Sequence, residues 1–485
     1  MKKSRSPSGS KKSFSSEGKP LRPSAQMPVV NPHAAGIDVG ATAHWVCVPE
    51  DSVPPDQSPV REFGAYTRDL DEMVEWLLKC AVKTVVMEST SVYWIPLFQK
   101  LESAGLEVLL VNARHVRHVP GRKSDCQDCQ WLQRLHSYGL LNGSFRPNDD
   151  ICRLRTLMRH RDNLTKMCAQ QVQHMQKALN YMNIHLHHAV SALHGETGLR
   201  ILDAILAGER DPEELVKLRD PQITRSTEEE MKAALTGDWR EEELFVLRQS
   251  RENYRHLLKQ MESCEAELEK ALAKVVVNPA NAEDAERPPN PAPAQRAGQA
   301  GAKKKKFRIL KAGTGMKRDV RAELTRICGV DLTQIVGLNM LSVLIIISEI
   351  GVDMSRWRSA KAFASWLGLC PGNKISGGKI LSSRTKPVAN RVSILLRNLG
   401  PVVGRTDTWL GIYHRRMKSR LGPAGANTAT ARKLACIIYH LLKYKEEYID
   451  VDCFLYQEKM RKSRIVKLQK QAEELGFDLI RKEAA

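Results

Sequence analysis

Hydrophobic and polar positions follow different periods along the chain, and these periods divide it into regions. Short apolar runs bounded by Gly or polar residues predict strands in AAGIDVG, HWVCVPE, VREFGAY, KTVVMES and LEVLLV. Residues 67–80 predict a helix whose apolar face holds Leu70, Met73, Val74, Leu77 and Leu78. Residues 91–104 and 126–138 also read as helices. Strands first, then strands alternating with helices, predict an α/β domain over residues 33–145.

Residues 146–277 change to a helical pattern with a seven-residue repeat. Apolar rows run through Ile151, Met158, Thr165, Val172 and Leu179, and through Leu154, Arg161, Cys168, Met175 and Met182. A second stretch has the rows Leu247, Tyr254, Met261, Leu268 and Val275, and Leu257, Cys264 and Ala271. Such a and d positions predict a coiled-coil seam, formed within one chain or between chains. An ordinary helical hairpin explains the same pattern.

The remaining segments have distinct compositions. Residues 1–32 predict a disordered basic tail, and residues 278–316 a Pro/Ala/Lys linker. Residues 317–450 predict a mostly helical domain, and residues 451–485 a charged helical tail. The longest apolar run, within 335–351, is too short to span a bilayer and predicts a buried helix. We expect no membrane association, and the start of the chain does not read as a signal peptide.

The charge of the chain points to a polyanionic partner. The formal net charge is +20, and about +14 remains when the first 24 residues are set aside. A generically basic protein without such a partner is the simpler interpretation. Eleven scattered cysteines predict reduced thiols and a cytoplasmic chain, associated with the nucleoid if the partner is DNA.

Four carboxylates stand out against apolar or basic surroundings. Asp38 lies in the apolar strand GIDVG, and Glu88 ends the strand TVVME. Asp125 and Asp128 open a helix, where positions i and i+3 share a face about 5–6 Å apart at Cβ. Convergence at one sheet edge would suit Mg²⁺ (or Mn²⁺) and phosphodiester chemistry. Each carboxylate also has a structural explanation, because such residues support tight turns and begin helices.

A cysteine pair in the same stretch, GRKSDCQDCQWL, offers a different metal site. Cys126 and Cys129 have zinc-ligand spacing, but a complete site needs two more ligands. His115 and His118 would supply them in a His₂Cys₂ arrangement. The competing interpretation is that both cysteines pack on the apolar side of the helix.

The order of these motifs resembles the DEDD-type insertion-sequence transposases, a family of bridge-RNA-guided recombinases with a serine nucleophile. A strand with Asp, a strand with Glu and then K-x-D-x-x-D follow one another in this family's order, and the resemblance covers about 33–182 and 320–445. It implies a ribonuclease-H-like N-terminal domain. It also places the family's acidic tetrad on Asp38, Glu88, Asp125 and Asp128.

The second part of the resemblance contains a serine segment. VGLNMLSVLIIISEIG is similar to a helix-hairpin-helix-like turn in which Asn339 replaces a glycine, so we expect left-handed backbone there. In residues 356–400 the family nucleophile maps onto Ser376 in ISGG, with Ser382 and Ser383 as nearby alternatives. Basic residues around it are candidates to neutralise nucleic-acid phosphates: Lys374, Lys379, Arg384, Lys386 and Arg391.

The resemblance implies a transposase that cleaves and rejoins DNA under the direction of a structured noncoding RNA. It further implies a homo-oligomer, dimer or tetramer, with an active site composed of the acidic and serine domains. Two other functions are compatible with the residues. One is a metal-dependent nuclease or junction resolvase that uses water, and the other is a catalytically inert nucleic-acid-binding protein.

Overall fold

The computed structural model describes residues 28–89, 91–112, 125–223, 226–276, 315–388, 390–450 and 453–478. Most of the predicted basic tail and linker lies outside these ranges, as do His115, His118 and the GRK loop. The chain forms two compact units, Met1–Arg146 and Pro147–Ala485. Every helix of the described residues is too short or too polar to cross a bilayer.

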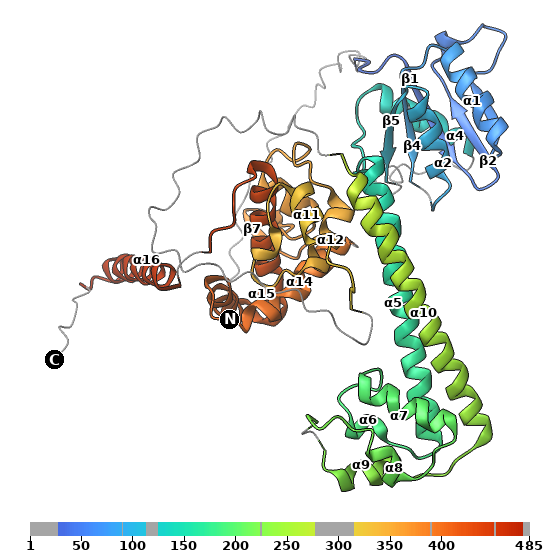
Figure 1. Cartoon of the computed structure of the whole chain (residues 1–485). Coiled ribbons are helices and arrows are strands. Elements are labelled where there is room, and N and C mark those ends of the chain that lie inside the picture. Colours follow the sequence, from blue (N-terminus) through green and yellow to red (C-terminus); the bar gives the residue numbers. More distant parts are fainter. Residues whose placement is uncertain are drawn as a thin grey trace, which may run out of the picture. The chain divides into compact units, whose positions relative to one another are not determined.

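The first unit is a five-stranded mixed sheet with helices (Figure 1). Its strands are β1 (Ala34–Val39), β2 (Ala43–Cys47), β3 (Val60–Gly64), β4 (Thr84–Glu88) and β5 (Glu107–Val111). Their spatial order is β3-β2-β1-β4-β5. β1, β2 and β3 pair antiparallel, whereas β1, β4 and β5 run parallel. Its helices are η1 (Glu50–Ser52), α1 (Thr67–Lys79), α2 (Trp94–Ser103) and α4 (Asp125–Ser137).

Side chains alternate between the two faces of this sheet, as the period of a strand requires. Ile37 and Met87 lie in the larger core with α1 and α2, whereas Val86 packs with Leu132 of α4 on the other face. The predicted strands and helices of this unit are therefore confirmed. One position on the predicted apolar face of α1 is wrong, because Leu78 is 49% exposed.

The second unit contains a long antiparallel pair of helices, α5 (Asp149–Tyr181) and α10 (Glu241–Lys274) (Figure 1). The heptad rows are buried along both helices, except that Thr165 and Val172 are half-buried. The repeat therefore pairs two helices of the same chain, as both an intramolecular seam and an ordinary helical hairpin predict. An intermolecular seam is not needed to explain it.

A buried ion pair lies inside this hairpin. The guanidinium of Arg161 on α5 donates to the Glu265 carboxylate of α10 at 2.7 and 2.9 Å, and both side chains are under 5% exposed. The second oxygen of Glu265 accepts from the backbone N–H of Lys317 at 3.0 Å. The pair thus joins three segments through one desolvated carboxylate.

Replacing Arg161 alone should destabilise the hairpin strongly. In Arg161→Met, Glu265 loses the buried cation that pairs with it, and such uncompensated charges cost about 3–5 kcal/mol. The double variant Arg161→Met/Glu265→Leu should cost less than the sum of the two single variants. Urea unfolding of the three proteins measures this coupling. Additive losses would show that the two side chains act independently.

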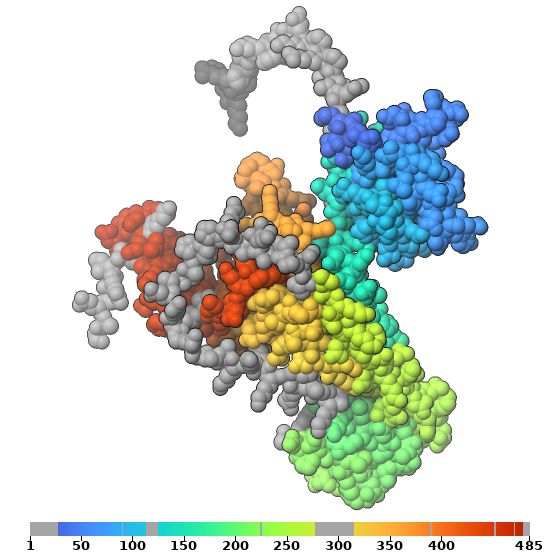
Figure 2. All heavy atoms as spheres, turned by 45° about the horizontal axis from the view of Figure 1, so that its top comes forward, coloured from blue at the N-terminus to red at the C-terminus, as the bar shows by residue number. Residues whose placement is uncertain are grey.

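Four short helices lie at the end of the hairpin where α5 ends and α10 begins. They form what we call the tip lobe, shown as a compact green body in Figure 2. They are α6 (Leu186–Ala189), α7 (Glu196–Ala207), α8 (Pro212–Val216) and α9 (Glu228–Leu235). Asp203 anchors the lobe to α10. Its two carboxylate oxygens accept hydrogen bonds from Nε and Nη2 of Arg251 at 2.9 and 2.8 Å. Paired contacts of this kind fix orientation as well as position.

The C-terminal part of the second unit is mostly helical. It contains α11 (Arg321–Cys328), η3 (Leu332–Gln334), α12 (Met340–Ile350), α13 (Ala360–Trp366), α14 (Arg391–Gly404), α15 (Trp409–Tyr444) and α16 (Cys453–Glu474). A separate hairpin is made by β6 (Lys374–Ser376) and β7 (Lys379–Ser382). The predicted buried helix in 335–351 is confirmed as α12, which is almost completely buried.

The expectation of left-handed backbone at Asn339 is wrong. Asn339 has extended dihedrals and is the N-cap of α12, where its Oδ1 accepts from Ser342 N at 2.8 Å. Asn is favoured at N-caps because its side chain satisfies an otherwise unpaired N–H of the first turn. The left-handed residue of this turn is Gly337, with φ +90°.

A set of ion pairs connects α5 to this helical part. Glu349 of α12 accepts from Arg159 at 2.9 and 3.0 Å and lies 3.4 Å from Arg155. Arg391 of α14 pairs with Asp162 of α5 and lies 3.8 Å from Glu349. The first half of α5 is therefore part of the packing of the C-terminal helices.

Candidate functional site

Two of the four predicted carboxylates lie side by side on the sheet. β1 and β4 are parallel, and their register pairs Ile37 with Met87, so the next positions, Asp38 and Glu88, are neighbours at the same edge. Because Ile37 and Met87 face the larger core, the alternation of side chains turns Asp38 and Glu88 to the face covered by α4.

The other two carboxylates come from α4, which lies very close to β1. A Cβ on Gly36 would be 2.3 Å from the Gln133 backbone nitrogen and 2.4 Å from the Cys129 carbonyl oxygen. Only glycine permits this approach. Asp125 and Asp128 occupy the first turn of the helix, three residues apart.

Asp38 lies within the electrostatic influence of the other three carboxylates. Burial, followed by the negative charges of Asp125, Asp128 and Glu88, raises the pKa of Asp38 to about 6. The tetrad thus combines carboxylates from two strands and one helix. No three of these carboxylates have oxygens within 4.8 Å of one another among the described residues. The side chains are neighbours but do not yet form a complete set of ligands around one ion.

This donor set fits a divalent cation. The four side chains offer only oxygen atoms, which hard cations such as Mg²⁺ and Mn²⁺ prefer. The negative charges of the other three also act on Asp38, and a bound cation would lessen that repulsion. Asp38, Glu88, Asp125 and Asp128 are therefore the residues that would hold it.

The cysteine pair is placed differently. Cys129 is fully buried against β1 and its thiol donates to the Cys126 carbonyl at 3.1 Å, whereas Cys126 is half-buried. Burial raises the pKa of the Cys129 thiol. On the same helix Leu132 is buried and Trp131 is half-buried. The described residues thus give the zinc interpretation no support.

Ser376 lies at the end of β6, in a hairpin of residues 374–382 that we call the serine hairpin. It pairs with Lys379 across a two-residue turn, Gly377–Gly378, in which both residues have positive φ. Ser376 is exposed. Three apolar side chains of the same hairpin are also more than 60% exposed: Ile375, Ile380 and Leu381. The hairpin therefore presents its serine and an apolar surface to the outside.

The predicted phosphate-binding residues are not equivalent in the structure. Lys374 and Lys379 are exposed on the serine hairpin, and Arg384 and Lys386 are exposed just after it. Arg391 differs, because its guanidinium pairs with Asp162 and lies near Glu349. These ion pairs give Arg391 a part in helix packing, and its contact with nucleic acid stays a prediction.

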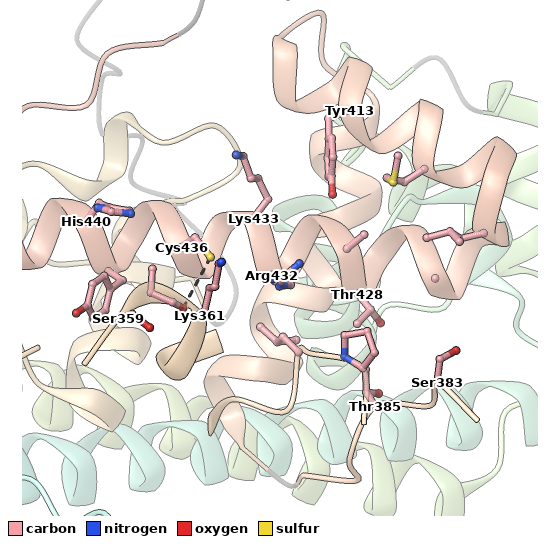
Figure 3. Close-up of a pocket in the computed structure, with 18 of the residues that line it drawn as sticks. Ser359, Lys361, Ser383, Thr385, Tyr413, Thr428, Arg432, Lys433, Cys436 and His440 are labelled. Atoms are coloured by element: carbon pink, nitrogen blue, oxygen red, sulfur yellow. Dashed lines mark hydrogen bonds between the residues drawn. The ribbon is translucent and has the colours of Figure 1, made fainter. Parts of the chain in front are cut away.

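A pocket of about 1410 Å³ lies next to this segment, among α13, α15 and residues 383–385 (Figure 3). Ser383 and Thr385 lie on one side of it, and Lys361, Arg432 and Lys433 on others. Its lining contains no Asp or Glu but seven cationic residues: Arg358, Lys361, Arg384, Arg420, Arg432, Lys433 and Lys443. Tyr413 and Tyr444 add aromatic rings. Such a surface suits a phosphate-bearing ligand with planar groups.

The shape of this basic pocket depends on a break in α15. Gly422 has φ 74° and ψ 175°, a conformation that only glycine adopts readily, and Pro423 follows it. The break lets both halves of α15 line the same pocket, with Arg420 before it and Arg432 after it. Sequence reasoning missed this pocket; the LGP triplet, a strong breaker inside a helical pattern, was the available signal.

Comparisons with known families agree with this geometry. Residues 35–184 match the model of the DEDD transposases of IS110 type, described as transposase, and residues 331–398 match that of the transposase IS116/IS110/IS902 family. No curated protein matches the chain. A DEDD transposase domain implies a ribonuclease-H-like fold, to which the observed mixed sheet corresponds. The chain therefore carries the domains of an enzyme that cleaves and rejoins DNA.

Proposed function

We propose that the chain is an insertion-sequence transposase that uses Ser376 as its nucleophile and the acidic tetrad as a Mg²⁺ site. The observation that carries this proposal is the placement of Asp38 and Glu88 on neighbouring strands packed with α4, whose first turn holds Asp125 and Asp128. The match of residues 331–398 to a transposase family supports a role for the serine hairpin, which lies within it.

The reaction follows from the chemistry of a hydroxyl nucleophile. The Ser376 Oγ forms a bond to a DNA phosphorus while its proton passes to water. The bond from that phosphorus to one deoxyribose oxygen breaks, and this oxygen leaves with the bonding electrons and takes up a proton from water to become a hydroxyl. The resulting phosphoserine ester conserves the bond, so a hydroxyl of another strand can reverse the step and rejoin the DNA. A bound divalent cation would supply charge neutralisation at the phosphate. Gly377 and Gly378 form a two-residue turn with positive φ and place no side chain beside Ser376.

The exposed serine hairpin supports a site completed by another surface. Exposed apolar side chains beside a candidate nucleophile are typical of a surface that is covered in the working complex. We propose a homo-oligomer, dimer or tetramer, in which the tetrad and the serine act on one phosphodiester. A structured noncoding RNA guides it to its target, and the enzyme works at the nucleoid.

A metal-dependent nuclease that uses water is the second candidate, and the tetrad alone would suffice for it. A denaturing gel with labelled donor DNA, the full chain, Mg²⁺ and the candidate RNA separates the two. We expect a protein-linked DNA band that survives boiling. Cleavage without this band in every condition would establish the nuclease, and binding without cleavage would establish an inert binding protein.

The basic pocket should contribute to nucleic-acid binding. Arg432→Ala is expected to weaken binding to about the same degree across sequences and to reduce the slope of log K against log salt by about 1, because one phosphate contact is lost. Fluorescence anisotropy at several salt concentrations measures both. Lys418→Ala is the control, since Lys418 is exposed on the same helix but does not line the pocket. Equal effects of the two variants would remove the pocket from the interface.

A further inference from the structure

Three histidines meet at the start of the tip lobe. His185 precedes α6, and His187 and His188 lie within it. One ligand atom from each imidazole lies within 4.8 Å of the other two, and the described residues contain no other such group of three metal-binding side chains. The ring centroids of His187 and His188 are 4.2 Å apart, and those of His185 and His188 are 5.4 Å apart. Neither family match includes these residues.

The fold holds this segment in place on both sides. The backbone N–H of His185 donates to the Ala234 carbonyl of α9 at 2.8 Å, and that of His188 donates to the His185 carbonyl at 2.8 Å. Leu186 and Ala189 of α6 are buried in the lobe. The apolar positions therefore point inward, and the three imidazoles are brought together by the packing of the lobe.

The ring nitrogens carry two further signs of a ligand site. His185 Nε2 lies 3.0 Å from the side-chain oxygen of Asn183. If that nitrogen carries the proton, Nδ1 has the free lone pair, and such an outer hydrogen bond is typical of metal-bound histidines. His187 Nδ1 is buried without a hydrogen-bond partner among the described residues. Buried polar atoms are rarely left so, and a bound ion would satisfy this one.

We propose that His185, His187 and His188 bind one transition-metal ion, most naturally Zn²⁺. Imidazole nitrogens favour Zn²⁺, Co²⁺, Ni²⁺ and Cu²⁺ over the hard cations. Three protein ligands leave a tetrahedral ion one position for water, and the exposure of His188 gives solvent access to it. The chain then has two metal sites of different chemistry, because the acidic tetrad offers only oxygen.

The consequence for the lobe is local order. All three ligands lie within four consecutive residues, so the ion fixes α6 and the turn at Asn183, whose φ is +54°, rather than joining distant segments. Binding should therefore raise the stability of the lobe without altering the pairing of α5 and α10.

Metal content of the tag-free full-length protein tests the site directly. After incubation with Zn²⁺ and dialysis, we expect about one equivalent of zinc by elemental analysis in the parent protein, and its loss in His187→Ala and His188→Ala. His194→Ala is the matched control, since His194 is exposed nearby and outside the group. Cys126→Ser/Cys129→Ser should also retain the zinc. With Co²⁺, the parent should show the visible absorption of a tetrahedral site without thiolate bands, and excess Mg²⁺ should not remove it.

His188→Ala is the decisive variant, because His188 is exposed and its loss leaves the core of the lobe intact. Circular dichroism of each variant confirms the fold. Unchanged zinc in His188→Ala, or loss of zinc in His194→Ala to the same extent, would overturn the proposal. Loss of zinc in the double cysteine variant would assign the ion to Cys126 and Cys129. None of these results bears on the transposase reaction, which the variants of the acidic tetrad and of Ser376 test separately.

Discussion

Asp128→Asn is expected to bind donor DNA as tightly as the parent protein while its cleavage rate falls by more than about 100-fold. Loss of an outer partner of a metal ligand already costs about 10- to 100-fold, and this change removes a proposed ligand itself. The amide keeps the shape of the side chain but lacks the negative charge that Mg²⁺ requires. The same result is expected for Asp125→Asn, because the two residues share the first turn of α4. Strand cleavage and gel-shift assays on the same preparations measure the two effects.

Thermal unfolding gives a readout that does not depend on activity. The charges of Asp125 and Asp128 raise the pKa of Asp38, so removing one of them relieves repulsion. In metal-free buffer Asp128→Asn should unfold at the same temperature as the parent or higher, and Mg²⁺ should raise Tm only in the parent. Asp56→Asn, an exposed carboxylate of the same unit, is the control. Full cleavage by Asp128→Asn at low Mg²⁺ would count heavily against the tetrad.

Ser376→Ala is expected to abolish recombination and the covalent DNA adduct together, with the fold unchanged. Ser376 is exposed at the end of β6 and removal of its hydroxyl takes away only the proposed nucleophile. The two-residue turn depends on Gly377 and Gly378, which remain. A denaturing gel with labelled DNA shows the adduct, and circular dichroism shows the fold.

Ser382 and Ser383 are the built-in controls for this experiment. The Ser382 hydroxyl accepts from Arg384 N at 3.3 Å, and Ser383 lines the basic pocket, where its surroundings suit phosphate binding. We expect each alanine variant to keep measurable adduct formation. If Ser383→Ala loses the adduct and Ser376→Ala keeps it, the pocket holds the nucleophile.

Secondary structure and the four carboxylates were predictable because their signals are local. Asp38 lies within the apolar run GIDVG and Glu88 ends the apolar run TVVME, and the i, i+3 spacing puts Asp125 and Asp128 on one helix face. The role of Asn339 was predicted wrongly because Asn is compatible with both left-handed turns and N-caps. Its extended dihedrals and its contact with Ser342 distinguish them.

The sequence by itself determined the strands, the helices, the heptad rows and the order of the acidic motifs, since each depends on periods of a few residues. Tertiary structure decided that α5 pairs with α10 of the same chain, that Arg391 meets Asp162, and that α13 and the two halves of α15 enclose a basic pocket. It also decided that the imidazoles of His185, His187 and His188 come together. These contacts depend on which surfaces pack against each other and on helix breaks such as the one at Gly422. A local sequence pattern predicts a helix or strand but does not specify which distant segment will pack against it.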